Sequence, residues 1–77
     1  MVNNRTAFEA RMEKRRAVVE AEAQGTVADS MAVRTALMTK VHAGELTLLQ
    51  AQAELKQIQR GAAAAGKITR AQAFNAG

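Results

Sequence analysis

Residues 43–51, AGELTLLQA, have the sequence of a tight corner between two helices. Gly44 can adopt the left-handed backbone conformation with which many helices end. Thr47 is a suitable N-cap for the next helix. Gln50, three residues later, completes a capping box, in which each side chain bonds to the backbone N–H of the other residue. We therefore predict that one helix ends near residue 43 and that another begins at residue 47.

The same pattern recurs along the chain and predicts where the other helices begin. Residues 65–73, AGKITRAQA, repeat it 22 residues later, and Gly25-Thr26 with Asp29 is a plainer version. Thr6 with Glu9 predicts the start of a first helix. The chain has no proline, much alanine and no alternating run of β-branched residues, which favours helix over strand. The predicted fold is all-α, a helical bundle or extended helical hairpins, with helices at about 6–24, 26–43, 47–65 and 69–75.

The composition predicts a small hydrophobic core. The chain has 77 residues, and 18 of its 37 hydrophobic residues are alanines, which leaves 19 larger apolar side chains. A chain of this length forms one domain, residues 1–77, in which residues 1–5 are a candidate flexible arm. Without cysteine it has no disulfide to stabilise it. We therefore expect the protein to gain stability from a protein partner or from copies of itself.

The spacing of apolar residues predicts which side chains form the core and the contacts. In the first helix the large apolar residues share one stripe, and Ala10, Ala17 and Ala21 form a smooth face opposite. In the third helix, apolar residues recur in steps of three and four and form a narrow seam. Both phenylalanines are expected to anchor the core. The residues predicted for core and partner contact together are Phe8, Met12, Leu48, Leu55 and Ile58, with Leu49 as an exposed contact candidate.

Arg34 has an unusual predicted position, because it falls near the middle of the apolar arc of the second helix. A charge on such a face must extend to solvent, pair with a carboxylate or reach a partner molecule. An internal ion pair or a solvent-directed side chain is one interpretation. The other is a polar anchor in an intermolecular contact, so Arg34 is also a partner-contact candidate.

The charge distribution makes nucleic-acid binding the main alternative function. The net charge is +4, and residues 1–16 alone carry a balance of +3. The cations that would meet phosphates are Arg11, Lys14, Arg15 and Arg16. Glutamates are interleaved with them, however, and the chain has no tyrosine or tryptophan on which bases could stack. Nucleic acid is therefore a possible partner that ranks below a protein.

The sequence lacks the motifs of catalytic and metal sites. It has no Gly-rich phosphate loop and no nucleophile motif, and His42 is the only histidine in a chain without cysteine. No apolar run has the length of a membrane span, and the N-terminal residues do not have the pattern of a signal peptide. We therefore expect no enzymatic activity, cofactor, metal, small-molecule substrate or membrane partner, and a location in the cytoplasm or a virion.

A resemblance adds to these predictions. Gly44, Leu46 and Thr47, followed by Gln50 and Leu55, resemble the helical hairpin of SHOCT-type modules over residues 35–58. That resemblance implies oligomerisation, although the aromatic residue usual in that family is absent here. The whole chain also resembles many small bacteriophage proteins in its size and composition. The leading hypothesis is a structural or accessory assembly protein of a phage virion. Besides nucleic-acid binding, the other alternative is a phage-type inhibitor that binds a specific host protein.

Overall fold

The computed structural model describes residues 6–76, which form the helices α1 (Ala7–Ala23), α2 (Met31–His42), α3 (Leu48–Arg60) and α4 (Arg70–Ala76). Within this range no residue belongs to a strand, and the single isolated bridge is a parallel one between Val27 and Ile68. The all-α prediction is confirmed. Among the helices described, none combines the length and the apolar character that crossing a membrane would require.

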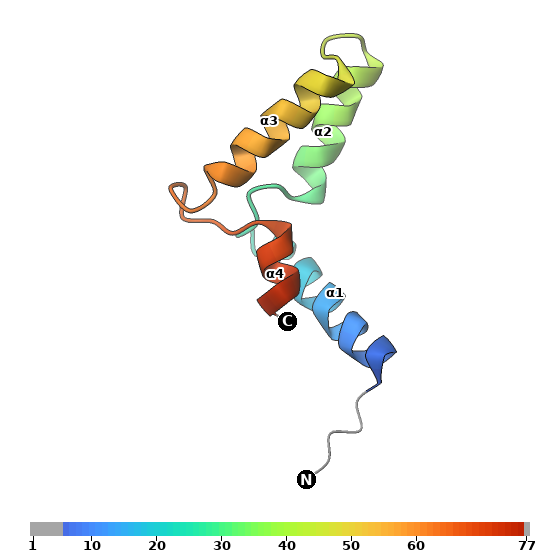
Figure 1. Cartoon of the computed structure of the whole chain (residues 1–77), viewed down its shortest axis with the longest axis vertical. Helices are drawn as coiled ribbons and strands as arrows, with labels where there is room; N and C mark the ends of the chain where they lie inside the picture. Colours follow the sequence, from blue (N-terminus) through green and yellow to red (C-terminus); the bar gives the residue numbers. More distant parts are fainter. Residues whose placement is uncertain (1–5, 77) are drawn as a thin grey trace.

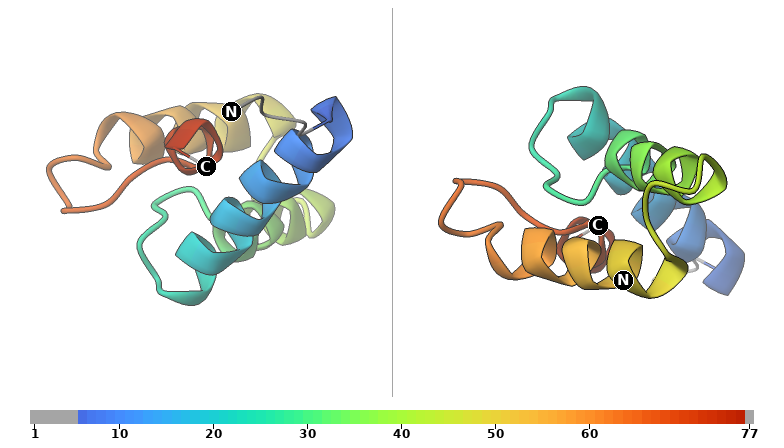
Figure 2. Two further views of the ribbon diagram at one scale, coloured as in Figure 1. Left: turned by 90° about the horizontal axis from the view of Figure 1, so that it is seen from below. Right: turned by 90° about the horizontal axis from the view of Figure 1, so that it is seen from above.

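The four helices form two pairs that are stacked end to end (Figures 1 and 2). One pair is the hairpin of α2 and α3, and the other is formed by α4 packing on α1. Between the pairs lies a waist, made by the connectors 24–30 and 61–69. There the N–H of Ala28 donates to the oxygen of Ile68 at 2.8 Å, and the N–H of Ile68 donates to the oxygen of Thr26 at 3.0 Å. The two connectors are therefore held together directly by backbone hydrogen bonds.

The predicted corner between α2 and α3 is confirmed. Gly44 has φ +77°, and Thr47 is the N-cap of α3. The N–H of Gln50 donates to Thr47 Oγ1 at 3.1 Å, and the N–H of Thr47 donates to Gln50 Oε1 at 2.9 Å. Thr69 and Gln72 make the same reciprocal pair at the start of α4. Both capping boxes therefore form from residues close in sequence, as the pattern predicts.

The ends of α1 and α4 agree with the predictions, whereas the predicted start of α2 was wrong. The helix begins at Met31 rather than at Thr26, and Ser30 is its N-cap. Thr26 does not cap a helix, because its hydroxyl donates to the oxygen of Ala21 and its backbone oxygen belongs to the bridge with Ile68. The long-range pairing of the two connectors therefore keeps residues 26–29 out of the helix.

The predicted end of α3 was also wrong. The helix ends at Arg60 rather than near residue 65, and Gly61 is its C-cap. Residues 61–66 form turns, in which the N–H of Lys67 donates to the oxygen of Ala62 at 2.8 Å. Four alanines in this segment favour helix locally. The turns instead lead the chain back to the waist, where Ile68 pairs with Val27.

The core is small, and α1 contributes a different face to it from the one predicted. The cluster between α1 and α4 consists of Val18, Val27 and Ala73, with Ala21 packed against it. Phe8 is 70% exposed and Met12 is 41% exposed, so the expectation that they belong to the core was wrong. On α1, Val18 and Ala21 contribute to this cluster, and Ala21 belongs to the predicted alanine face. Phe8 and Met12 lie outside it and line a separate hollow. Phe74, the other expected anchor, is also partly exposed, at 37%.

We predict that Gly44→Ala lowers the free energy of unfolding by about 1 to 2 kcal/mol, because an L-residue is strained in the left-handed conformation. A Cβ on Gly44 would meet nothing within 4 Å, so the backbone alone accounts for the cost. Urea denaturation measures it. Gly44→Asn is the control and should lose less, since asparagine tolerates this conformation. If Gly44→Ala left the free energy of unfolding unchanged or raised it, the chain would not turn at Gly44 in the left-handed conformation.

Candidate functional site

The waist is organised by the side chain of Asp29, which is only 1% exposed. Its Oδ1 accepts a hydrogen bond from the backbone N–H of Arg70 at 2.7 Å. Its Oδ2 accepts from Arg34 Nη2 and from Gln59 Nε2, both at 2.9 Å. One carboxylate therefore connects α2, the last turn of α3 and the first residue of α4. Of the interpretations considered for Arg34, the structure shows the internal ion pair, with Asp29 as its partner. An additional contact with a partner molecule stays a prediction.

Glu22, in the last turn of α1, connects the remaining helix to the waist. Its Oε1 accepts from the N–H of Met31, the first residue of α2, at 2.8 Å. The same oxygen lies 3.1 Å from Arg70 Nε in an ion pair. Asp29 and Glu22 thus tie the ends of all four helices together. Each of these contacts joins segments that are separate in the fold, which indicates a structural role for both carboxylates.

The environment of Asp29 makes the stability of the protein dependent on pH. Burial by itself would raise the pKa of this carboxyl, but hydrogen bonds from Gln59, from the Arg70 N–H and from Arg34 outweigh burial and lower the pKa. A carboxyl whose pKa is lower in the folded than in the unfolded state stabilises the fold when it is ionised. That stabilisation is present above the unfolded pKa and is lost as the pH falls through the folded value.

We therefore predict that the free energy of unfolding is nearly constant from neutral pH down to about pH 5 and falls below about pH 4, the region of the ordinary aspartate pKa. Urea denaturation, followed by circular dichroism at a series of pH values, measures this change. In Asp29→Asn the free energy of unfolding should fall much less below about pH 4 than it does in the wild type. An equal loss in the variant would assign the acid sensitivity to other carboxylates.

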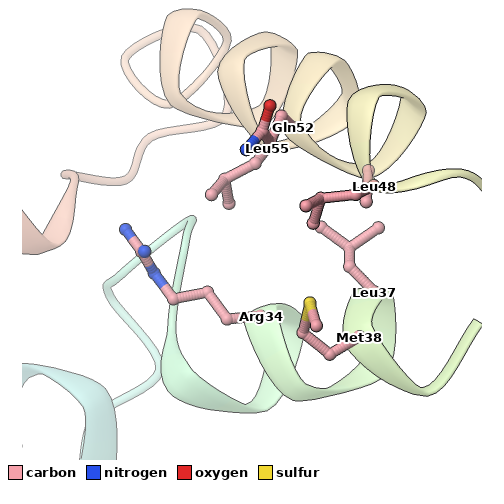
Figure 3. Close-up of a pocket in the computed structure, with 7 residues that line it drawn as sticks. Arg34, Leu37, Met38, Leu48, Gln52 and Leu55 are labelled. Carbon is pink, nitrogen blue, oxygen red and sulfur yellow. The ribbon is translucent and has the colours of Figure 1, made fainter. Parts of the chain in front are cut away.

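A second feature is an apolar groove between α2 and α3, with a volume of about 250 Å³ (Figure 3). Leu37 and Leu48 lie at one end of the groove, and Arg34 reaches toward the other end. Leu48 is 53% exposed and Met38 is 40% exposed, so the groove is open to solvent. Its surface suits the apolar side chains of another protein. The full lining is Arg34, Leu37, Met38, Leu48, Ala51, Gln52 and Leu55.

A third feature, which we call the cationic hollow, lies between α1 and α4 and has a volume of about 390 Å³. Arg15, Val18 and Val19 line it from α1, and Arg70 and Phe74 line it from α4. The ammonium of Lys14 lies 5.5 Å from the centre of the Phe74 ring, which is a cation–π distance. The hollow therefore combines positive charge with an aromatic surface.

The structure distributes the predicted contact residues over several surfaces. Arg34, Leu48 and Leu55 meet in the groove. Leu49 is 76% exposed and is not among the groove residues, and Ile58 is half-buried. Phe8 and Met12 line a separate hollow on α1 with Glu9, Glu13 and Arg16. A contact role for these residues stays a prediction.

The predicted phosphate-binding cations are divided in the same way. Lys14 and Arg15 adjoin the cationic hollow, whereas Arg16 lies with the glutamates of the hollow around Phe8. Arg70 and Phe74 were missed because they are distant from α1 in sequence. The spacing of Thr69 and Gln72 predicts where α4 begins. No residue near them in the sequence indicates which helix α4 packs against.

No group of three or more histidine, cysteine, aspartate or glutamate residues is placed to hold a metal ion within residues 6–76. Comparison of the chain with protein-family models, with curated proteins and with solved structures finds no match. The case for a function therefore rests on the groove and on the cationic hollow.

Proposed function

We propose that this chain is a non-enzymatic assembly or adaptor protein, which works by surface contact as a structural or accessory component of a larger complex. The resemblance to small phage proteins suggests a virion as the setting. One observation carries the proposal: large apolar side chains such as Leu48 and Met38 lie exposed along an open groove, while half of the buried hydrophobic residues of the described chain are alanines. In helix-in-groove recognition, a hydrophobic groove receives the apolar side chains of a partner helix.

The energetics of a small core support the same proposal. Buried alanines such as Ala51, Ala62 and Ala73 remove little apolar area from water, so their contribution at about 25 cal/mol per Å² is small. Ordering the backbone costs about 1 to 2 kcal/mol per residue. Covering Met38, Leu48 and Leu55 with another chain would add the burial that the isolated protein lacks. A second copy is the first partner to test.

We predict that the protein self-associates and that its melting temperature rises with concentration, because association stabilises the folded state. Sedimentation velocity and thermal melting over a concentration series measure both. Leu48→Gln should weaken association, since Leu48 lines the groove. Ala53→Gln is the control, because Ala53 is an exposed residue of the same helix that lies outside the groove lining. A compact monomer with a melting temperature independent of concentration would exclude self-association.

A further inference from the structure

The cationic hollow concentrates positive charge from two helices that are distant in the sequence. Arg15 and Arg70 line it from opposite sides, and Lys14 lies beside it over Phe74. Arg11 precedes Lys14 by three residues and Arg15 by four, so it shares their side of α1. Arg11 and Arg15 are exposed, and the side chain of Arg70 is 32% exposed. All four cations are therefore placed to meet an anionic ligand in one region.

Few carboxylates offset this charge. Glu22 lies at the waist end of the hollow, where it pairs with Arg70. Glu9 and Glu13 line the hollow around Phe8 instead, on another side of α1. Glu20 follows Arg16 by four residues and so lies on that side as well. These three glutamates thus lie on a different side of α1 from Arg11, Lys14 and Arg15, whereas Arg16 lies among them.

The hollow also offers a flat apolar surface beside its cations. The ring of Phe74 is partly exposed, and Val18 and Val19 line the same space. Proteins that bind single-stranded nucleic acid combine cations along the backbone with aromatic side chains on which bases stack. An acidic peptide would form ion pairs with the cations, but its carboxylates would not stack on the aromatic ring or pack against the valines. A recess between two helices also suits a flexible single strand better than a rigid duplex.

We infer that the cationic hollow binds single-stranded nucleic acid. Phosphates contact Arg11, Arg15 and Arg70, and a base stacks on the Phe74 ring in place of the Lys14 ammonium, which lies 5.5 Å from the centre of that ring. This site is separate from the apolar groove of α2 and α3, so the protein has one surface for protein and one for nucleic acid. The inference does not depend on self-association, and its test measures a different property.

The test is fluorescence anisotropy with a labelled oligothymidylate strand over a range of salt concentrations. The double variant Arg11→Gln/Arg15→Gln should bind about 10-fold or more weakly at low salt. Its plot of log affinity against log salt should be shallower by about 1.4, which is two phosphate contacts at about 0.7 each. Phe74→Leu should bind about 10-fold more weakly with an unchanged slope, because it removes stacking without removing charge. Circular dichroism confirms that each variant is folded.

A matched control removes the same charge elsewhere. Arg16 lies with the glutamates around Phe8, and Lys40 lies in the last turn of α2, so Arg16→Gln/Lys40→Gln should bind nearly as well as the wild type. If the control weakens binding as much as Arg11→Gln/Arg15→Gln, the attraction is general and the site is refuted. If a polyglutamate peptide binds as tightly as the strand, the hollow is a site for acidic protein. Absence of binding at low salt also overturns the inference.

Discussion

Replacing Asp29 with asparagine should lower the free energy of unfolding by about 2 to 4 kcal/mol, whereas breaking a fully buried ion pair costs about 3 to 5 kcal/mol. Asparagine keeps the shape of the side chain but replaces one acceptor oxygen with an N–H₂ donor. In either orientation that donor faces other donors, the Arg70 N–H on one side or Arg34 and Gln59 on the other. The value lies below that of a fully buried pair because the Arg34 side chain is 35% exposed.

Urea denaturation at neutral pH measures this loss, and Glu54→Gln is its control. Glu54 is an exposed carboxylate of α3, so its neutralisation should change the stability by no more than about 0.5 kcal/mol. The denaturant midpoint of Asp29→Asn should fall well below that of Glu54→Gln. Equal midpoints would mean that the hydrogen bonds of Asp29 contribute no net stability.

Replacing Ala73 with leucine should destabilise the protein by about 1 to 3 kcal/mol, which is the usual cost of forcing extra methyl groups into a packed interior. Ala73 is buried in the cluster with Val18 and Val27, where α4 meets α1. A helix of 7 residues is not stable unless it is docked. The added volume should therefore displace α4 as a unit.

Hydrogen exchange measured by NMR distinguishes that displacement from global unfolding. In Ala73→Leu the amides of α4 should lose protection more than those of α2 and α3. Ala71→Leu is the control, because Ala71 is an exposed position of the same helix and leucine is a good helix former. It should leave the exchange of α4 unchanged or slow it. Equal loss of protection throughout Ala73→Leu would show that all four helices unfold together.

The sequence predicts those features that depend on residues close together. The capping boxes at Thr47 and Thr69 formed as expected, because both partners lie within four residues of each other. The starts of α1 and α4 follow from such local signals. The start of α2 does not, because the bridge to Ile68 changes the conformation of residues 26–29. No local signal indicates a pairing across some forty residues.

The same distinction applies to the candidate sites. The position of Arg34 on an apolar arc correctly indicated the need for a partner, and a carboxylate five residues earlier was available. The two other partners of Asp29, Gln59 and the Arg70 N–H, come from distant parts of the chain. The prediction that Phe8 belongs to the core was wrong for a different reason. Helix α1 has two faces suited to burial, and the spacing of residues does not determine which of them the fold uses.

The packing of α4 on α1 also determines the order in which the molecule can fold. The hairpin of α2 and α3 closes over the short turn at residues 43–47, so little chain entropy is lost when its helices meet. The pair of α1 and α4 closes only when the segment between them has been brought back to the waist. During synthesis, Val18 and Ala21 of α1 therefore stay uncovered until α4 has been synthesised. We expect contacts around Val18 to form after the folding transition state, so that their loss accelerates unfolding more than it slows folding.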